Sequence, residues 1–284
     1  MTNETHRAGK PRGTLVAIGG GDYEQAEQID RRLLELAGGP NAPVALLPTA
    51  HPSRKVGDKF TAYYATLGAR NVKVVPVYER EDAFKQEHLD VLQDARLIFI
   101  SWGMNTRLVD ILLGTPVQDV LTQAYHKGTV MGCMSAGARM AGELSIARGT
   151  GMEALREGIK EGPIRQEEPG GKGPIQFQPA FNWAPGIVFE PHLSEYNRYG
   201  HFLLLTALRP DMTWVGIDER TAVIVHPDER VEVIGSSNVF VSRRRKPAKV
   251  VPPTEGRPLE AWDLRMDILA HGAQTTLSEL RRER

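Results

Sequence analysis

The stretch 130-VMGCMSAGARM-140 decides the fold, because it takes the chain from a short apolar strand through small residues into a helix. A sharp strand-to-helix turn can expose a nucleophile, and crowding there requires small residues two positions before and two after it. The stretch holds two candidates, Ser135 and the chain's only cysteine, Cys133. Ser135 has Cys133 and Gly137 at those positions, whereas Met131 stands two before Cys133. The spacing favours Ser135, and a packing turn without chemistry is the alternative.

On both sides of this turn, short apolar runs alternate with segments of helical length. Strands that are apolar throughout and alternate with helices indicate a parallel sheet covered on both faces. The sequence therefore predicts an α/β fold, a doubly wound and mostly parallel sheet with helices on both faces. Strands are expected at 15–18, 44–47, 72–77, 97–100 and 130–131, and helices within 23–37, 61–67, 89–92, 106–113 and 117–126.

The last third of the chain changes character. After a strand at 187–189 and a helix at 196–208, β-rich runs follow one another between polar turns, which predicts antiparallel strands that extend the same sheet. These runs are 212–217, 221–225, 231–234 and 239–241.

Proline and glycine mark an interruption of the pattern. Residues 143–187 are rich in both, which predicts a loop insertion near the active site, either a surface excursion or a pocket wall. The expected organisation is a disordered lead at 1–12, one α/β domain at 13–270 and a C-terminal tail at 271–284.

Composition excludes several classes of function. The 35 basic residues balance the 35 acidic ones, which gives no reason to expect a nucleic-acid or anionic-membrane partner. No apolar run approaches the ~18 residues of a membrane span, and a single cysteine forms no internal disulfide. Neither an H-E-x-x-H motif nor a cysteine pair is present, so we expect no metal and no cofactor. We predict a cytoplasmic protein and leave a homodimer open.

A serine nucleophile needs a base, which is usually histidine. Among eight histidines, His192 ends the apolar run of 187-IVFEPHLSEYNR-198, at the carboxyl end of a strand, where open α/β sheets bind ligands. In an extended strand Glu190 points to the same side as His192. Asp218 and Glu219 follow the next strand, within 215-VGIDERTAVIV-225, and either acid could reach this edge. These residues indicate a catalytic triad whose acid is left open between the two.

Four segments together resemble the serine peptidase family of cyanophycinases and aspartyl dipeptidases, the peptidase E family. They are CMSAGA (133–138), GIVFEPHLSEYNR (186–198), GIDERTAVIV (216–225) and VEVIGSSNVFV (231–241). VALLPTA (44–50) and FISWGMNTRLVDIL (99–112) occupy the places of two further family segments. The resemblance implies a fold like that of class I glutamine amidotransferases. It also implies hydrolysis of a small peptide substrate at an aspartyl or isoaspartyl bond, through an acyl-enzyme.

The resemblance also implies a role for each matching residue. Ser135 matches the nucleophile, His192 the base and Glu219 the acid that orients the base, as in other triads. The backbone N–H groups of Gly103 and Ala136 would form the oxyanion hole. The remaining assignments are a supporting role for Glu190 and substrate binding by Asn105 and Arg198.

A substrate carboxylate needs a cation, and a guanidinium binds a carboxylate with two parallel hydrogen bonds. Arg198, Arg107 and Arg139 are the candidates, and we rank Arg198 first. Arg139 lies four residues after Ser135, and we predict that it is a charge on the helix surface.

The chain departs from the family pattern at several places. Glu190 stands two before the histidine, where the family usually has aspartate, and the insertion at 143–187 is longer and richer in glycine and proline than the family pattern. The family turn reads glycine-glycine, then an acid or amide and glutamine, whereas this chain has WGMN at 102–105. After the histidine, the glutamine and arginines of cyanophycinases are replaced except for Arg198, which leaves open whether cyanophycin is the substrate. The altered turn motivates a second hypothesis, a non-catalytic amidotransferase-like module that binds a small molecule. A third, nucleotide binding at 19-GGGD-22, lacks the G-x-G-x-x-G spacing.

Overall fold

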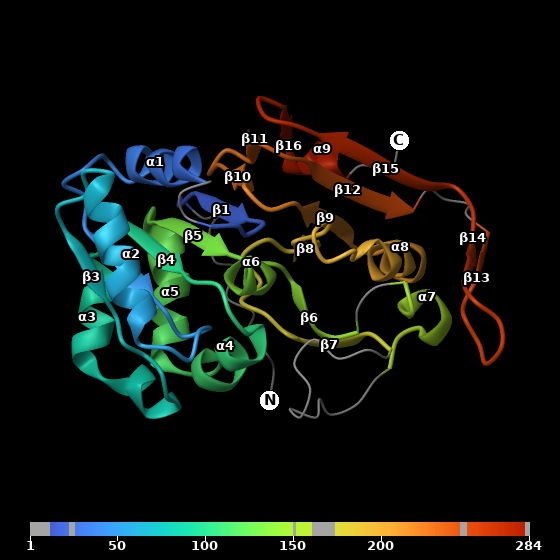
Figure 1. The fold of residues 1–284 in the computed structure, drawn as a ribbon, viewed down its shortest axis with the longest axis horizontal. Coiled ribbons are helices and arrows are strands. Elements are labelled where there is room, and N and C mark those ends of the chain that lie inside the picture. The colour runs from blue at the N-terminus through green and yellow to red at the C-terminus, as the bar shows by residue number, and fades with distance from the viewer. Residues whose placement is uncertain (1–11, 23–25, 150–151, 161–173, 245–248, 282–284) are drawn as a thin grey trace, which may run out of the picture.

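The computed structural model describes residues 12–22, 26–149, 152–160, 174–244 and 249–281. The predicted disordered lead lies outside the described residues except for Arg12. Figure 1 shows the two main sheets, a larger one built mostly from the N-terminal half of the chain and a smaller one formed by later strands.

The larger sheet has eight strands in the order β16-β11-β10-β1-β5-β4-β2-β3. Five of them run parallel, which confirms the predicted doubly wound core. These are β1 (Leu15–Ile18), β2 (Val44–Leu47), β3 (Val72–Val74), β4 (Leu97–Ile100) and β5 (Val130–Met134). Antiparallel strands extend the sheet beyond β1, namely β10 (Thr221–Val225), β11 (Arg230–Gly235) and β16 (Gln274–Thr276).

Helices cover both faces of this sheet, as predicted (Figure 1). Successive β1 side chains face opposite ways, so that Leu15 packs in one core and Val16 in another. The Val16 side is closed by α1 (Glu27–Leu36) and α2 (Lys55–Thr66). The Leu15 side is closed by the 3-10 helix η2 (Arg80–Phe84) and by α3 (Gln86–Asp94), α4 (Asn105–Leu112), α5 (Pro116–Lys127) and α6 (Ala136–Ala141).

A second, four-stranded sheet corrects the expectation that all later strands extend the first one. Its order is β15-β12-β9-β8, with β8 and β9 parallel and the other pairs antiparallel. It comprises β8 (Ile187–Pro191), β9 (Thr213–Ile217), β12 (Val239–Arg244) and β15 (Leu264–Leu269). The physical reason is α8 (Tyr199–Leu208), whose sequence YGHFLLLTAL is apolar on nearly all sides. A helix that is apolar on all sides must be buried on all sides, and this second sheet packs against part of its surface.

The segment 143–187 is not simply a loop, which corrects the second expectation. It contains β6 (Leu144–Arg148), α7 (Ala154–Glu157) and β7 (Gln176–Pro179), and β6 pairs with β7. Ile146 and Ile175 anchor it, because both are buried in the core around α8. These isolated apolar residues are hidden in the sequence by the surrounding glycines and prolines. Residues 150–151 and 161–173 lie outside the described part.

Within the predicted tail, the structure describes residues 271–281. These residues form β16 and α9 (Leu277–Arg281), and Leu277 and Leu280 are buried because they lie three residues apart on one helix face. A small ribbon of β13 (Val250–Val251) and β14 (Glu260–Ala261) precedes the tail. Within the described ranges, no helix has the length and apolar character that crossing a membrane requires.

Candidate active site

Ser135 lies on the strained turn that its neighbours predict. It joins β5 to α6 with φ 53° and ψ −106°, a combination that is costly for any residue with a side chain. Its N–H donates to the carbonyl of Ile18 at 2.9 Å, which fixes the turn against β1. A Cβ on Gly137 would lie 2.8 Å from the Ile100 carbonyl oxygen, so the small residue there is required by contact.

Cys133 does not compete as a nucleophile. Its thiol is buried in β5, and burial raises its pKa well above the ordinary value. The thiolate is the reactive form, so this cysteine is an inert packing residue.

His192 follows the last residue of β8, also with a positive φ of 51°. Its N–H donates to the carbonyl of Gly19 at 3.0 Å, and a Cβ on Gly20 would lie 2.0 Å from His192 Cε1. Any side chain at Gly20 would therefore displace the imidazole. Gly20 is therefore required by its close approach to His192, while a Cβ on Gly19 would lie 2.0 Å from the Asp218 carbonyl oxygen.

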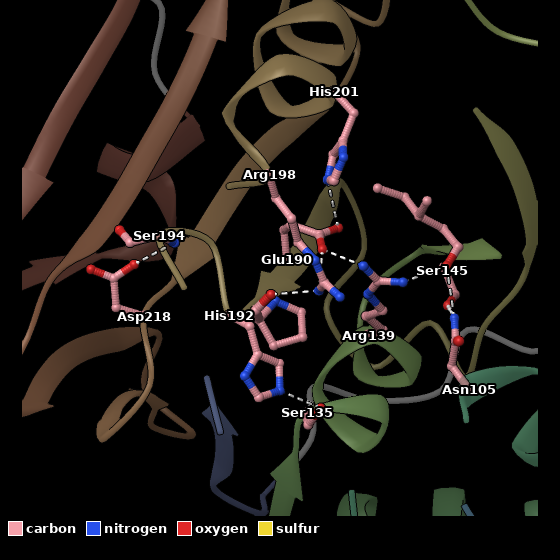
Figure 2. A network of polar contacts seen from close by, with 12 residues as sticks. Asn105, Ser135, Arg139, Ser145, Glu190, His192, Ser194, Arg198, His201 and Asp218 are labelled. Carbon is pink, nitrogen blue, oxygen red and sulfur yellow. Dashed lines mark hydrogen bonds and ion pairs between the residues drawn. The ribbon is translucent and has the colours of Figure 1, made fainter. Parts of the chain in front are cut away.

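The three predicted triad side chains form a hydrogen-bonded chain. Ser135 Oγ lies 2.7 Å from His192 Nε2 (Figure 2), and His192 Nδ1 lies 2.7 Å from Glu219 Oε1. With the proton on Nδ1 donated to the carboxylate, Nε2 is left to accept from the serine hydroxyl. The elements that bring these residues together are the β5–α6 turn, the end of β8 and the turn between β9 and β10.

Asp218, the other candidate acid, has a different position. It is buried, and its two carboxylate oxygens accept from the Ser194 N–H and the Ser237 hydroxyl, each at 3.1 Å. Figure 2 shows it turned toward Ser194 and away from His192. Asp218 therefore holds the turn after the histidine, while its neighbour Glu219 reaches the ring.

The surroundings of His192 oppose its protonation. Burial lowers its pKa below the usual value and Arg198 and Arg139 lower it further, while the hydrogen bond to Glu219 raises it. The base is thus held neutral, and able to accept a proton, to a lower pH than a solvated histidine.

Behind the triad lies a buried cluster of charges around Glu190, which is fully buried (Figure 2). Arg139 and Arg198 both donate to Glu190 Oε1, and His201 Nε2 lies 3.4 Å from Oε2. Burial alone would raise the pKa of Glu190, but the two guanidinium groups hold it well below its usual range. Burial lowers the pKa of His201 although Glu190 acts in the opposite sense, which favours the neutral ring at pH 7. Two cations and one anion leave this cluster with one net positive charge.

Arg139 corrects the expectation of a helix-surface charge. It is 9% exposed, and besides Glu190 it binds the carbonyl of Ile146 at 2.8 Å. The spacing of four residues from Ser135 was the available signal, because it places Arg139 one helical turn further along α6. His201 gave no signal of its own, since it lies within an apolar helix.

Two cavities meet at Ser135. The larger cleft has a volume of about 430 Å³ and lies on the side of His192, where Trp102, Tyr196 and Glu219 line it. The smaller pocket of about 200 Å³ lies on the other side. Asn105, Ala136, Arg139 and Arg148 are among its lining residues, and Gly103, Ser135 and Arg198 border both cavities.

The other predicted site residues, Gly103, Ala136 and Asn105, also line the cavities, but the structure does not test the roles predicted for them. Gly103 has φ 142°, and a Cβ there would lie 2.2 Å from the Ala50 carbonyl oxygen. Gly103 lines both cavities together with Ser135, and Ala136 follows Ser135 directly, but the oxyanion role of their N–H groups stays a prediction. Asn105 uses its amide nitrogen to hold β6, through Ser145 Oγ at 2.7 Å and the Ile146 carbonyl at 2.8 Å (Figure 2). Substrate binding by Asn105 therefore also stays a prediction.

Arg107 is the candidate cation that the structure separates from the site. It donates to the carbonyl oxygens of Thr49 and Tyr78, at 3.2 and 2.9 Å, and lines neither cavity. Among the described residues, no three or more His, Cys, Asp or Glu side chains are grouped to hold a metal ion.

Comparisons with known proteins identify the family of this chain. The family model described as "Peptidase family S51" matches residues 15–234. A cyanophycinase of Geminocystis herdmanii is 28% identical over 271 residues, 92% of each chain. A cyanophycinase of Thermosynechococcus vestitus is also 28% identical, over 96% of this chain and 81% of that one.

Two solved structures share the fold. A peptidase from an acI-B1 Actinobacterium superposes with a TM-score of 0.68 at 21% identity, covering 95% of this chain and 98% of the other. A peptidase E protein from Listeria monocytogenes has a TM-score of 0.52 at 13% identity, covering 79% and 99%. Because the family model spans most of the chain and the curated relatives match nearly all of it, this chain belongs to peptidase family S51 and is a serine peptidase.

Proposed function

We propose that this peptidase hydrolyses small peptides at aspartyl or isoaspartyl bonds, through an acyl-enzyme on Ser135. The observation that carries the proposal is the positively charged cluster of Arg139, Arg198 and Glu190, which borders the smaller pocket next to Ser135. A single net positive charge in a buried setting suits a substrate with one carboxylate close to the scissile carbonyl.

The reaction would begin when His192 Nε2 accepts the Ser135 hydroxyl proton as Oγ attacks the scissile carbonyl carbon. The backbone N–H groups of Gly103 and Ala136 would stabilise the resulting oxyanion. His192 then gives its proton to the departing amine, and the C–N bond breaks. Water, activated by the same imidazole, hydrolyses the ester and releases the acid product.

The two cavities would take opposite parts of the substrate. The leaving amine must depart where His192 can protonate it, so it belongs in the larger cleft. The acyl residue then falls in the smaller pocket, beside Arg139 and Arg198. A volume of about 200 Å³ suits one residue of aspartyl size better than a longer peptide, which supports an exopeptidase or dipeptidase.

The relatives named cyanophycinase make cyanophycin the competing substrate. Trp102 lines the larger cleft at a position where the family pattern has glycine, and Tyr196 lines it as well, so the wall of the cleft is bulkier and less polar than that pattern predicts. We therefore place short peptides ahead of the polymer. The wall formed by Trp102 is also the observation that favours the second candidate, a binding module without catalysis.

The decisive experiment compares Asp-X, β-Asp-X and Ala-X dipeptides and cyanophycin, with Ser135→Ala as the matched control. We expect turnover of at least one aspartyl or isoaspartyl dipeptide, none of Ala-X, and loss of activity by about 10⁴-fold or more in the variant. Preference for cyanophycin would overturn the short-peptide proposal. No turnover, together with no adduct from a serine-reactive phosphonate, would favour the binding module.

A further inference from the structure

Tyr196 lies in a tight turn that returns the chain toward His192. The Tyr196 N–H donates to the His192 carbonyl at 3.1 Å, and the Arg198 N–H donates to the Leu193 carbonyl at 2.8 Å. Asn197 between them has a positive φ of 47°. This segment departs from the family pattern in sequence, and none of the triad assignments includes Tyr196.

The turn places the two rings face to face. The ring centroids of His192 and Tyr196 are 4.6 Å apart and the planes differ by 6°. The Arg198 guanidinium carbon lies 4.9 Å from the centroid of the same Tyr196 ring. Yet Tyr196 is 58% exposed, so the core gives no reason for a large aromatic residue at this position.

The hydrogen bonds of His192 leave its ring free to tilt out of its plane, and the stack on Tyr196 opposes this tilt. Nε2 and Nδ1 are fixed in the ring plane by Ser135 and Glu219, and the backbone at Gly20 crowds the Cε1 edge. In-plane contacts restrain tilting of the ring weakly, whereas a parallel ring against its face opposes it directly. An aromatic face also attracts a cation, and the imidazole becomes one when it takes the serine proton.

We infer that Tyr196 is a positioning residue for the catalytic base, holding His192 in the plane that joins Ser135 to Glu219 and stabilising the imidazolium formed during the reaction. The expected effect on kcat rests on the proposed function, because it needs the proposed substrate. The charged groups around His192 are Glu219, which favours the imidazolium, and Arg198 and Arg139, which oppose it. Asp22 borders the same cleft. Tyr196 adds an uncharged π face to this set.

The test compares Tyr196→Leu with Tyr196→Phe, which keeps the ring. For the aspartyl dipeptide identified by the substrate panel, we expect Tyr196→Leu to lower kcat about fivefold with KM unchanged. The pKa of His192, followed by NMR in the absence of substrate, should fall by about half a unit. Tyr196→Phe should match the wild type in both measurements. Phe84→Leu is the matched control, because Phe84 is similarly exposed (55%) and lines neither cavity.

Two outcomes would overturn the inference. One is an unchanged His192 pKa and kcat in Tyr196→Leu. The other is a change in KM alone, which would make Tyr196 a wall for the substrate and not a support for the base. Because the NMR titration needs no turnover, its result stands even if the proposed peptidase specificity fails.

Discussion

Two buried carboxylates, Glu190 and Asp30, show how this protein treats the same chemical group at its active site and away from it. Both are almost inaccessible to solvent, at 0% and 4% exposure. Glu190 receives guanidinium groups from Arg139 and Arg198. Among the described residues, Asp30 on α1 accepts hydrogen bonds from the hydroxyl groups of Tyr63 and Tyr64, at 3.1 and 2.8 Å.

The two pKa values move in opposite directions. Burial raises the pKa of Asp30 to about 7 because two neutral donors do not replace lost hydration. Burial also tends to raise the pKa of Glu190. The charges of Arg139 and Arg198 have the larger effect, however, so the pKa of Glu190 falls below the usual range. The identity of the partners, and not the depth of burial, decides whether the group stays charged. Glu190, at the active site, therefore keeps its negative charge. Substitutions at Glu190 and at Asp30 test the two halves of this comparison.

Among the changes that test this comparison, Glu190→Gln should have the largest effect. Removing the charge leaves two buried guanidinium groups without a counter-ion, so we expect the free energy of unfolding at pH 7 to fall by about 3 kcal/mol. A urea titration measures it. Glu190→Asp keeps the charge and is the control.

The sign of the pH dependence follows from the direction of the shift. A depressed pKa means that the Glu190 contribution is present above the ordinary value of 4.5 and is lost as the pH falls below it. Glu190→Gln should therefore cost less stability near pH 3 than at pH 7. An equal loss at both would show that the charge is not what matters.

Arg198→Met is expected to have the next largest effect, on catalysis. Arg198 borders both cavities and is the more exposed guanidinium of the pair, at 12% of its side chain against 10% for Arg139. Loss of a charge-assisted hydrogen bond to the substrate should lower kcat/KM for the aspartyl dipeptide about 50-fold. Arg198→Lys keeps the charge without the planar fork and should recover part of the loss. Equal activity in Arg198→Met and the wild type would show that Arg198, and with it the Glu190 cluster, does not bind the substrate carboxylate.

Asp30→Asn probes the other carboxylate and should raise stability at pH 8. The folded pKa of about 7 exceeds the ordinary 3.8, so the contribution of Asp30 is greatest below pH 3.8 and is lost as the pH rises through about 7. We expect a gain of about 1.5 kcal/mol at pH 8, below the ~4 kcal/mol that three pKa units set as a ceiling, since the amide must also satisfy both tyrosines.

The gain should disappear at pH 4, where Asp30 itself is neutral, and thermal unfolding at the two pH values measures the difference. Glu27→Gln, on the same helix but exposed, is the control. Destabilisation by Asp30→Asn at pH 8 would mean that the carboxylate is held charged, and the contrast with Glu190 would fail.

Much of the fold follows from local pattern. The uniformly apolar runs at β1, β2, β4 and β5 predicted the parallel core, because strands buried on both faces tolerate few polar residues. The pairing of later strands was not predictable in the same way. β9 and β10 are similar in the sequence, but β9 pairs with β8 and β12 while β10 pairs with β1 and β11. The pairing of β9 with β8 and β12 depends on the packing of the apolar helix α8 against this sheet.

The candidate site divides in the same manner. Small neighbours identified Ser135, and a strand end identified His192, because both signals are local. Between Asp218 and Glu219 the residues alone gave no decision, since adjacent side chains on a turn differ only in direction. The burial of Arg139 and the stack of Tyr196 on His192 were not foreseen, because each depends on a partner far along the chain or on the exact course of a turn.

By itself, the sequence determined an α/β chain with a strained serine turn, a histidine at a strand end and an acid pair nearby. Periodicity and crowding act over a few residues, so they can be read without coordinates. The family resemblance assigned Glu219 as the acid, and the tertiary structure shows its contact with the histidine. Only the tertiary structure decided which arginines share Glu190 and that Asp30 and Glu190 carry opposite pKa shifts. Those properties arise from desolvation and from charges that residues distant in sequence bring within hydrogen-bonding range.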